Sequence, residues 1–265
     1  MSAATIEQAF CALLSGFGRL EMVTSSIRSA MLSAHRRLES NLEVSTESRN
    51  GDLKISTHNM SYRNIDTNAP VFYDVTERGF DEVREDLISY RNRQYQWVLV
   101  EGFELFEAFT SASYAAFKTQ LPVEAIPKDD RSLSAKLNAL RKASPRLVFR
   151  ETRNARGMNY RSAMALIELL RHVIVHRGGW IQDEARFIVR LRSLVQRSNS
   201  GAADPDIERD SRFFLYKGTH GTEVCLLEYP ERDSGHAYTD RLGTLLGWLL
   251  SYSDCLKTEL VLKSS

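Results

Sequence analysis

Two histidines and two arginines gather within the stretch RHVIVHRGGW at residues 171–180, namely Arg171, His172, His176 and Arg177. An imidazole, whose ordinary pKa is about 6.5, can accept and donate a proton near neutral pH. A guanidinium can hold a phosphate in two places and oppose the negative charge that grows on its oxygens during a reaction. These residue types therefore fit acid–base chemistry on a phosphodiester, and two simpler explanations compete with it.

The segment from about 159 to 177 is predicted to be an amphipathic helix. At about 100° per residue, its leucines and isoleucines fall on one continuous apolar face. The opposite face carries Glu168, Arg171, His172 and His176, with Val175 among them. Because an apolar stripe packs on a core, the polar face is expected at an outer surface, a cleft or a subunit interface.

Helix capping is the first simpler explanation. Cations near the C-terminus of a helix are favoured by its dipole, by about 0.3–1 kcal/mol each. Gly178 or Gly179 in the left-handed conformation would then end the helix. Capping accounts for His176 and Arg177, but it does not require two histidines.

Metal binding is the second simpler explanation. His172 and His176 are four residues apart, as in zinc-binding HxxxH helices. Val173 occupies the place of the glutamate in HExxH, and no third ligand is obvious near the pair. The sequence therefore predicts no bound metal and no cofactor.

An arginine, a polar residue directly after it, a histidine five positions on and two glycines together resemble the hallmark of the HEPN superfamily, the higher-eukaryote and prokaryote nucleotide-binding domains. The resemblance covers residues 80–265, where WVLVEGFELFEAFTSASYAAF is similar to the long early helix of such domains and GTLLGWLLSYSDCLKTEL to the closing one. It implies a metal-independent endoribonuclease in which the RNA 2′-hydroxyl attacks its own phosphodiester and leaves a 2′,3′-cyclic phosphate. Such an enzyme would be a toxin or an antiviral, abortive-infection effector.

The resemblance also assigns roles. It implies that His176 is the general acid or base, that Arg171 is the phosphate clamp, and that His172 orients the site or touches the RNA backbone. Residues five apart point about 140° away from each other on an ideal helix, so Arg171 and His176 of one chain converge poorly. We therefore expect a homodimer whose twofold axis brings both pairs into one cleft.

Two questions about partners stay open at this point. An antitoxin or a defence-system protein is an expected partner, but Gly178 stands where some HEPN toxins carry a tyrosine that a partner enzyme modifies. The resemblance does not imply that form of regulation here. The alternative to an enzyme is a non-catalytic HEPN-like module that binds nucleotide or RNA, or that acts as a scaffold.

A basic segment, RKASPRLVFRETRNARGMNYR at residues 141–161, leads into the motif helix and contains one acid, Glu151. Its aromatic residues Phe149 and Tyr160 could stack on bases. The segment predicts RNA contact, and the alternative is a solvated basic loop. The residues expected to bind RNA are Arg177 of the motif together with Arg150, Arg153, Arg156 and Arg161.

The composition narrows the class of protein. The 265 residues carry a net charge of +1, so the overall charge indicates no partner. The three cysteines, Cys11, Cys225 and Cys255, form no CxxC pair, which fits a reducing compartment. The N-terminus has no basic region typical of a secretory signal, and there is no apolar run of about 18 residues to span a membrane. We therefore expect a cytoplasmic protein that does not enter a membrane.

The predicted fold is mainly α, a HEPN-like antiparallel helix bundle with one or two small β-hairpins. Residues 1–75 are expected to form an N-terminal extension, with a helix at 4–41 that breaks near Gly16 and Gly18 and a hairpin turning at Asn50-Gly51. Residues 76–265 are expected to form the HEPN-like domain, with a hairpin inserted at about 212–229. Its helices are predicted at about 79–119, 132–143, 159–177, 183–197 and 236–262, and residues between 143 and 159 are predicted to be a basic linker.

Overall fold

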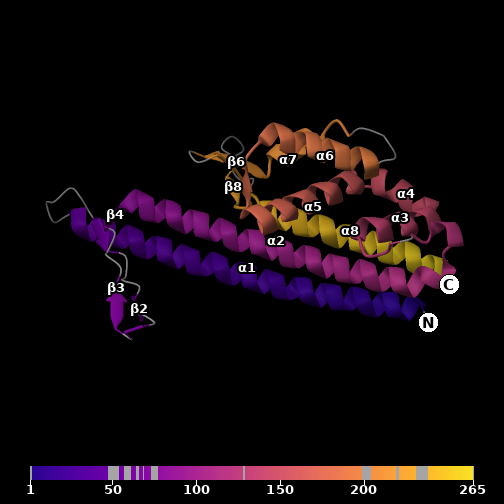
Figure 1. Cartoon of the computed structure of the whole chain (residues 1–265), viewed down its shortest axis with the longest axis horizontal. Coiled ribbons are helices and arrows are strands. Elements are labelled where there is room, and N and C mark those ends of the chain that lie inside the picture. The colour runs from indigo at the N-terminus through magenta and orange to yellow at the C-terminus, as the bar shows by residue number, and fades with distance from the viewer. Residues whose placement is uncertain are drawn as a thin grey trace. The chain divides into compact units, whose positions relative to one another are not determined.

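The structure, a computed structural model, describes residues 2–46, 54–56, 61–63, 66–67, 69–72, 77–127, 129–198, 204–218, 221–230 and 238–264. Within these ranges the chain is mainly helical with small antiparallel β-pairs, which confirms the prediction of a mainly α protein with small β-hairpins (Figure 1). The turn predicted at Asn50-Gly51 lies outside the described residues. None of the described helices combines the length and the apolar character that crossing a membrane requires.

The chain divides into two compact units. Unit 1 holds Met1–Thr24 and Arg93–Ser265, and unit 2 holds Ser25–Asn92. Helices α1 (Ser2–Thr46) and α2 (Phe80–Phe117) each contribute residues to both units.

Helix α1 runs without a break through Gly16 and Gly18, so the predicted interruption there is wrong. The reason is visible at Gly16, where an added Cβ atom would lie 2.7 Å from a methyl carbon of Leu105 on α2. The glycine lets α1 approach α2 closely, and it does so inside a regular helix.

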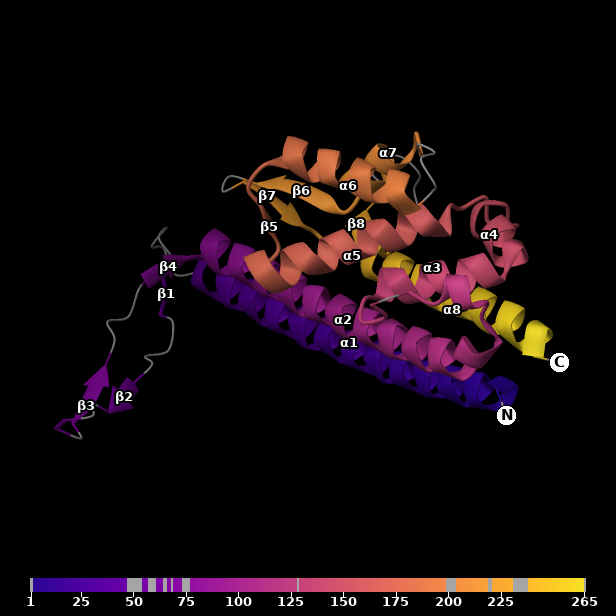
Figure 2. The same cartoon turned by 45° about the vertical axis from the view of Figure 1, so that its right-hand side comes forward.

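Unit 2 contains two short antiparallel strand pairs besides its helical parts (Figure 2). Strand β1 (Lys54–Ser56) pairs with β4 (Glu77–Gly79). Strand β2 (Ser61–Arg63) pairs with β3 (Pro70–Phe72), which overlaps the strand-like VFYDV of the sequence.

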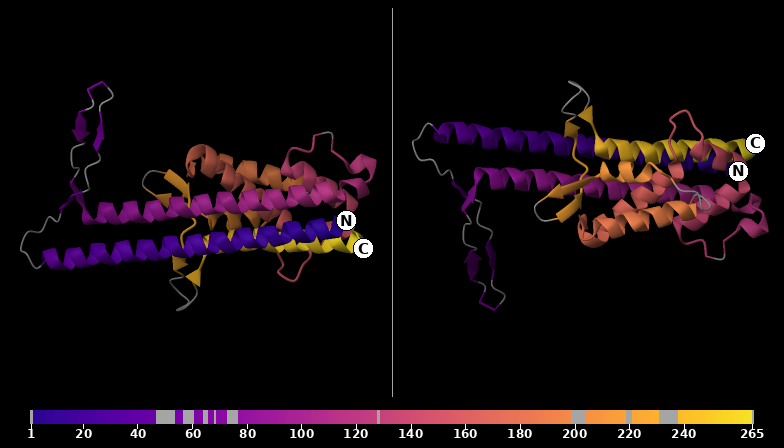
Figure 3. Two further views of the ribbon diagram at one scale, coloured as in Figure 1. Left: turned by 90° about the horizontal axis from the view of Figure 1, so that it is seen from below. Right: turned by 90° about the horizontal axis from the view of Figure 1, so that it is seen from above.

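Unit 1 is built around α5 (Tyr160–Arg177), which packs against α8 (Arg241–Ser264), α4 (Pro145–Thr152) and α6 (Glu184–Ser198). Helix α3 (Leu133–Ala143) precedes α4, and two 3-10 turns at Lys118–Gln120 and Val123–Ala125 connect it to α2. The first residues of α1 and the last of α8 lie at the same end of this unit (Figure 3). Fully buried side chains from α2, α5 and α8 make its core, among them Leu99, Phe106, Leu166, Ile167, Leu170, Leu249 and Tyr252.

Helix α4 occupies part of the segment for which the sequence predicts a linker, so that prediction is wrong for residues 145–152. Ser144 caps the helix, because its side chain accepts a hydrogen bond from the backbone N–H of Leu147 at 3.4 Å. Pro145 follows at the first helical position, where a backbone N–H would make no hydrogen bond within the helix, so its absence costs nothing. The Ser-Pro pair is therefore a helix start signal that the basic composition obscured.

A three-stranded antiparallel sheet lies next to the end of α5. Its strand order is β5 (Trp180–Ile181), β7 (Gly221–Val224), β6 (Leu215–Gly218). Strands β6 and β7 are the hairpin predicted within 212–229, whereas β5 and helix α7 (Ile207–Arg212) were not expected. Strand β8 (Tyr229–Pro230) pairs with β9 (Tyr238–Thr239), and α8 begins at Arg241, five residues later than predicted.

Candidate functional site

Helix α5 carries the motif on its last two turns. The helix begins at a cap, where the Asn159 side chain accepts hydrogen bonds from the backbone N–H groups of Arg161 and Ser162 at 3.1 and 3.3 Å. Its apolar face is buried, and the polar face between Glu168 and Arg177 is the part that meets solvent. The predicted amphipathic helix, its bounds and its polar face are therefore confirmed.

Two glycines fix how α5 ends. Gly178 has φ 59° and Gly179 has φ 85°, conformations that favour glycine. A Cβ atom on Gly179 would lie 2.5 Å from the side-chain amide of Gln96 on α2. The same amide donates to the Val224 carbonyl at 2.7 Å, and the Val224 N–H donates to the Gly179 carbonyl at 2.9 Å. The residues directly after His176 are thus held between α2 and β7.

The two imidazoles lie side by side at this end of the helix. The ring centres of His172 and His176 are 4.6 Å apart, with an angle of 52° between the ring planes. His176 and Arg177 are exposed, and His172 is half-buried. Burial lowers the pKa of His172, and the positive charges of Arg190, His176, Arg177 and Arg171 lower it further.

Arg171 is directed toward α2. Its guanidinium carbon lies 5.3 Å from the ring centre of Phe103, and its Nη2 lies 3.7 Å from Oε1 of Glu104. The side chain is 30% exposed, and among the described residues its buried Nε has no hydrogen-bond partner. Arg171 therefore combines a packed stem with a guanidinium that is partly reachable from solvent.

Three charged residues near the motif were not predicted from the sequence. Arg190 on α6 acts on His172, and Glu104 on α2 faces Arg171. Desolvation and the Glu107 carboxylate raise the pKa of Glu168, while Arg171 and Arg190 lower it. No local signal marks Glu104, Glu107 or Arg190, because their place depends on which faces of α2 and α6 pack on α5.

The structure also bears on the metal alternative. Among the described residues, no group of three histidine, cysteine, aspartate or glutamate side chains is arranged to hold a metal ion. The charges that act on His172 come from Arg190, His176, Arg177 and Arg171, and positive charge disfavours binding of a cation.

Arg161, which the sequence grouped with the RNA-binding residues, lies in the interior. It is 7% exposed, and its Nε donates to Oε2 of Glu151 at 2.6 Å. Oε1 of the same carboxylate accepts from Nε of Arg141 at 2.8 Å and is hydrogen-bonded to the Tyr252 hydroxyl. That hydroxyl also accepts from Nη2 of Arg141 at 3.2 Å. Arg161 therefore joins a polar network that links α3, α4, α5 and α8, and its guanidinium does not face RNA at the surface.

The other arginines of the basic segment remain at or near the surface. Arg153 is exposed and lies over the Phe149 ring at 5.5 Å, and Arg156 is exposed and donates to the Ser251 hydroxyl at 2.6 Å. Arg150 is half-buried and pairs with Glu259 at 2.8 Å.

This basic segment and the motif stand at opposite ends of α5. The 16 residues from Tyr160 to His176 correspond to about 24 Å at ~1.5 Å per residue. The structure therefore brings Arg171, His172, His176 and Arg177 together, and it places the predicted RNA-binding arginines of the basic segment in a separate group.

Comparisons of the chain with families of known proteins, with curated protein sequences and with solved structures found no match.

Proposed function

We propose that this chain is an endoribonuclease of the HEPN type, which cleaves RNA without a metal ion and serves as a cytoplasmic toxin or an antiviral, abortive-infection effector. The observation that carries the proposal is the pair of imidazoles 4.6 Å apart at the solvent-facing end of α5, with the positive charges of Arg171, Arg177 and Arg190 close enough to lower the pKa of His172. Imidazoles next to guanidinium groups are what a phosphodiester with an internal nucleophile requires.

The proposed reaction needs one proton acceptor and one proton donor. A neutral imidazole takes the proton of the RNA 2′-hydroxyl, and the 2′-oxygen forms a bond to phosphorus while the bond from phosphorus to the 5′-oxygen breaks. An imidazolium gives its proton to the departing 5′-oxygen, and the other product ends in a 2′,3′-cyclic phosphate. His176, which is exposed, is the residue proposed to move these protons. The lowered pKa of His172 keeps that ring neutral at neutral pH, so it accepts hydrogen bonds and orients the site.

A twofold homodimer completes the proposal. Arg171 is directed toward Phe103 and Glu104 on α2, whereas His176 lies exposed more than a turn further along α5. One chain does not aim both side chains at the same point, so we propose that a second chain supplies the partner residues across a symmetric cleft.

The test compares wild type, His176→Ala and His35→Ala on total RNA in the presence of EDTA. His35 is a matched control, because it is a histidine on α1 that pairs with Glu39 at 3.1 Å, outside the motif. We expect His176→Ala to slow cleavage by about 10²–10⁴-fold and His35→Ala to leave it unchanged. The products should carry 2′,3′-cyclic phosphate ends. Equal cleavage by wild type and His176→Ala would exclude His176 from the mechanism.

A non-catalytic RNA- or nucleotide-binding module is the second candidate, and one observation favours it. The stem of Arg171 packs on Phe103 and its guanidinium faces Glu104, which is how a structural arginine behaves. In that case the wild type binds RNA and does not cleave it. Arg153→Gln should then lower the slope of log affinity against log salt concentration by about 1, which corresponds to one lost phosphate contact. Single-turnover cleavage assays with excess protein separate the two candidates.

A further inference from the structure

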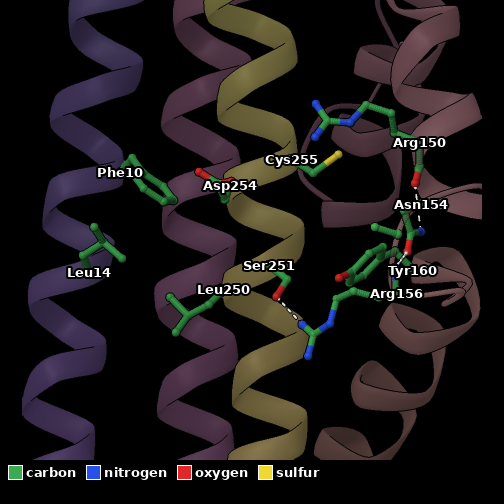
Figure 4. Close-up of a pocket in the computed structure, with 11 residues that line it drawn as sticks. Phe10, Leu14, Arg150, Asn154, Arg156, Tyr160, Leu250, Ser251, Asp254 and Cys255 are labelled. Atoms are coloured by element: carbon green, nitrogen blue, oxygen red, sulfur yellow. Dashed lines mark hydrogen bonds between the residues drawn. The ribbon is translucent and has the colours of Figure 1, made fainter.

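A cavity of about 470 Å³ lies at the other end of α5, between α1, the α4–α5 connection and α8 (Figure 4). Its volume falls within the range of about 300–1,000 Å³ that small-molecule sites occupy. None of its lining residues belongs to the histidine motif, so the cavity is a separate site from the proposed nuclease site.

One wall of the cavity is apolar. Phe10 and Leu14 come from α1, and Leu250 comes from α8. The ring of Tyr160 also lines the cavity, and its position is fixed because it stacks on Tyr252 at 5.7 Å with 13° between the planes. This wall can cover the apolar or planar part of a ligand.

The other wall carries arginines. Arg156 makes no ion pair within the part of the chain that the structure describes, and its Nη1 donates to the Ser251 hydroxyl at 2.6 Å. The connection that bears it is held by Asn154, whose amide donates to the carbonyls of Arg150 and Met158 at 3.0 and 2.7 Å. The Asn154 side-chain oxygen also accepts from the Arg156 N–H at 3.1 Å. The guanidinium is therefore positioned by the fold before any ligand arrives.

Positive charge exceeds negative charge around the cavity. Glu259 is shared between Arg150 at 2.8 Å and Arg146 at 3.3 Å, and Asp254 pairs with Lys257 at 3.1 Å. Of the residues that line the cavity, Arg150 and Arg156 are cations and Asp254 is a carboxylate, so the lining has an excess of one positive charge. Burial raises the pKa of the Cys255 thiol to about 11, so this lining group adds no negative charge at neutral pH.

We propose that this cavity binds a small phosphomonoester that carries an apolar or aromatic body. A phosphomonoester has a charge of about −1.5 to −2 at pH 7, and Arg156, which makes no ion pair among the described residues, is the lining cation left to receive it. Its oxygens fit the fork of Arg156, and its body fits the wall formed by Phe10, Leu14 and Leu250. The proposal does not depend on ribonuclease activity.

Calorimetric titration of the full chain tests the proposal with three probes, namely phenyl phosphate, inorganic phosphate and phenol. Phenyl phosphate should bind at least about tenfold more tightly than either of the others, because only it engages both walls. Arg156→Gln should weaken its binding by about 10–100-fold, as expected for loss of a hydrogen bond between charged groups. Leu14→Ser should weaken it several-fold through the loss of apolar cover.

Arg153→Gln is the matched control, since Arg153 lies three residues from Arg156 and does not line the cavity. It should leave the affinity for phenyl phosphate unchanged, and so should His176→Ala, which separates this site from the proposed nuclease. Leu14, Arg153 and Arg156 are exposed, and thermal melts that match wild type will show that the variants fold. Equal affinities for phenyl phosphate and inorganic phosphate, equal losses in Arg153→Gln and Arg156→Gln, or no binding of phenyl phosphate would each overturn the proposal.

Discussion

The imidazole of His172 faces that of His176 at 4.6 Å between ring centres, one turn apart on the exposed side of α5. Burial and the positive charges of Arg190, His176, Arg177 and Arg171 therefore act together on the His172 ring. The lowered pKa of His172 is the measurable sign of this arrangement.

The charge of Arg190 should be detectable in the titration of His172. Among the neighbouring charges, Arg190 lowers the pKa of His172 the most. Arg190→Gln should therefore raise the titration midpoint of His172. Proton NMR titration of the ring measures the midpoint directly. Arg197→Gln, a change near the other end of α6, should not move it, and an equal effect of both variants would mean that the shift does not arise at Arg190.

His172 should also make stability depend on pH. A histidine whose pKa is lowered by folding binds its proton more tightly in the unfolded chain, so its contribution to stability is complete above the unfolded pKa of about 6.5. That contribution is lost as the pH falls below this value. Urea unfolding of wild type and His172→Gln from pH 7.5 to 5 should therefore show a shallower decline in the variant. Parallel curves for the two proteins would contradict the assignment.

Removal of the Glu151 carboxylate should destabilise the fold strongly. Glu151→Ala leaves the buried guanidinium groups of Arg141 and Arg161 without their partner, which costs about 3–5 kcal/mol. Tyr252→Phe removes the hydroxyl that donates to this carboxylate and accepts from Arg141, and it should cost about 1.5–3 kcal/mol. Glu124→Ala, on the surface, should stay within about 0.5 kcal/mol of wild type. Urea unfolding gives these values, and a mild effect of Glu151→Ala would show that the network is not buried.

The two glycines after the motif should differ in their tolerance of alanine. Both substitutions place a side chain at positive φ, but only the Cβ of Gly179→Ala meets the Gln96 amide, whereas space is open at Gly178. Gly178→Ala should cost about 1–2 kcal/mol, and Gly179→Ala should cost more. The cost of Gly179→Ala should fall when it is measured in a Gln96→Ala background, because the clash is then gone. An unchanged cost in that background would place the strain elsewhere.

The proposed dimer makes a prediction about mixtures. Arg171→Ala and His176→Ala should each be inactive alone, but unfolding and refolding them together should restore part of the cleavage. A mixed dimer then holds one intact Arg171 and one intact His176. Light scattering should show twice the mass of one chain. Activity in a strictly monomeric wild type would remove the reason for a composite cleft.

Local patterns predicted α5 well, because each of its determinants lies within the segment. The apolar period, Asn159 as cap and Gly178 after the last turn all act over a few residues. The same kind of signal was present for α4 in the Ser144-Pro145 pair, and the density of arginines concealed it. The helix break predicted at Gly16 was wrong because no local signal reveals the role of this glycine. That role depends on Leu105, in a distant part of the chain.

The candidate site was predicted in part. The motif residues share one helix, so their common exposure followed from the helical period. The surroundings did not follow, because Glu104 and Arg190 arrive from α2 and α6 through tertiary packing. Arg161 shows the same limit, since only the fold reveals that a residue in a basic run is buried against Glu151.

The length of α5 sets a minimum span for any strand that touches both of its ends. The exposed Arg153 and Arg156 precede its first residue, Tyr160, and His176 lies about 24 Å from Tyr160 along the axis. At ~3.4 Å per stacked nucleotide, that gap corresponds to roughly seven nucleotides. For the proposed RNA substrate, a strand that stays stacked must be at least this long to reach both ends, and a shorter one must unstack and extend.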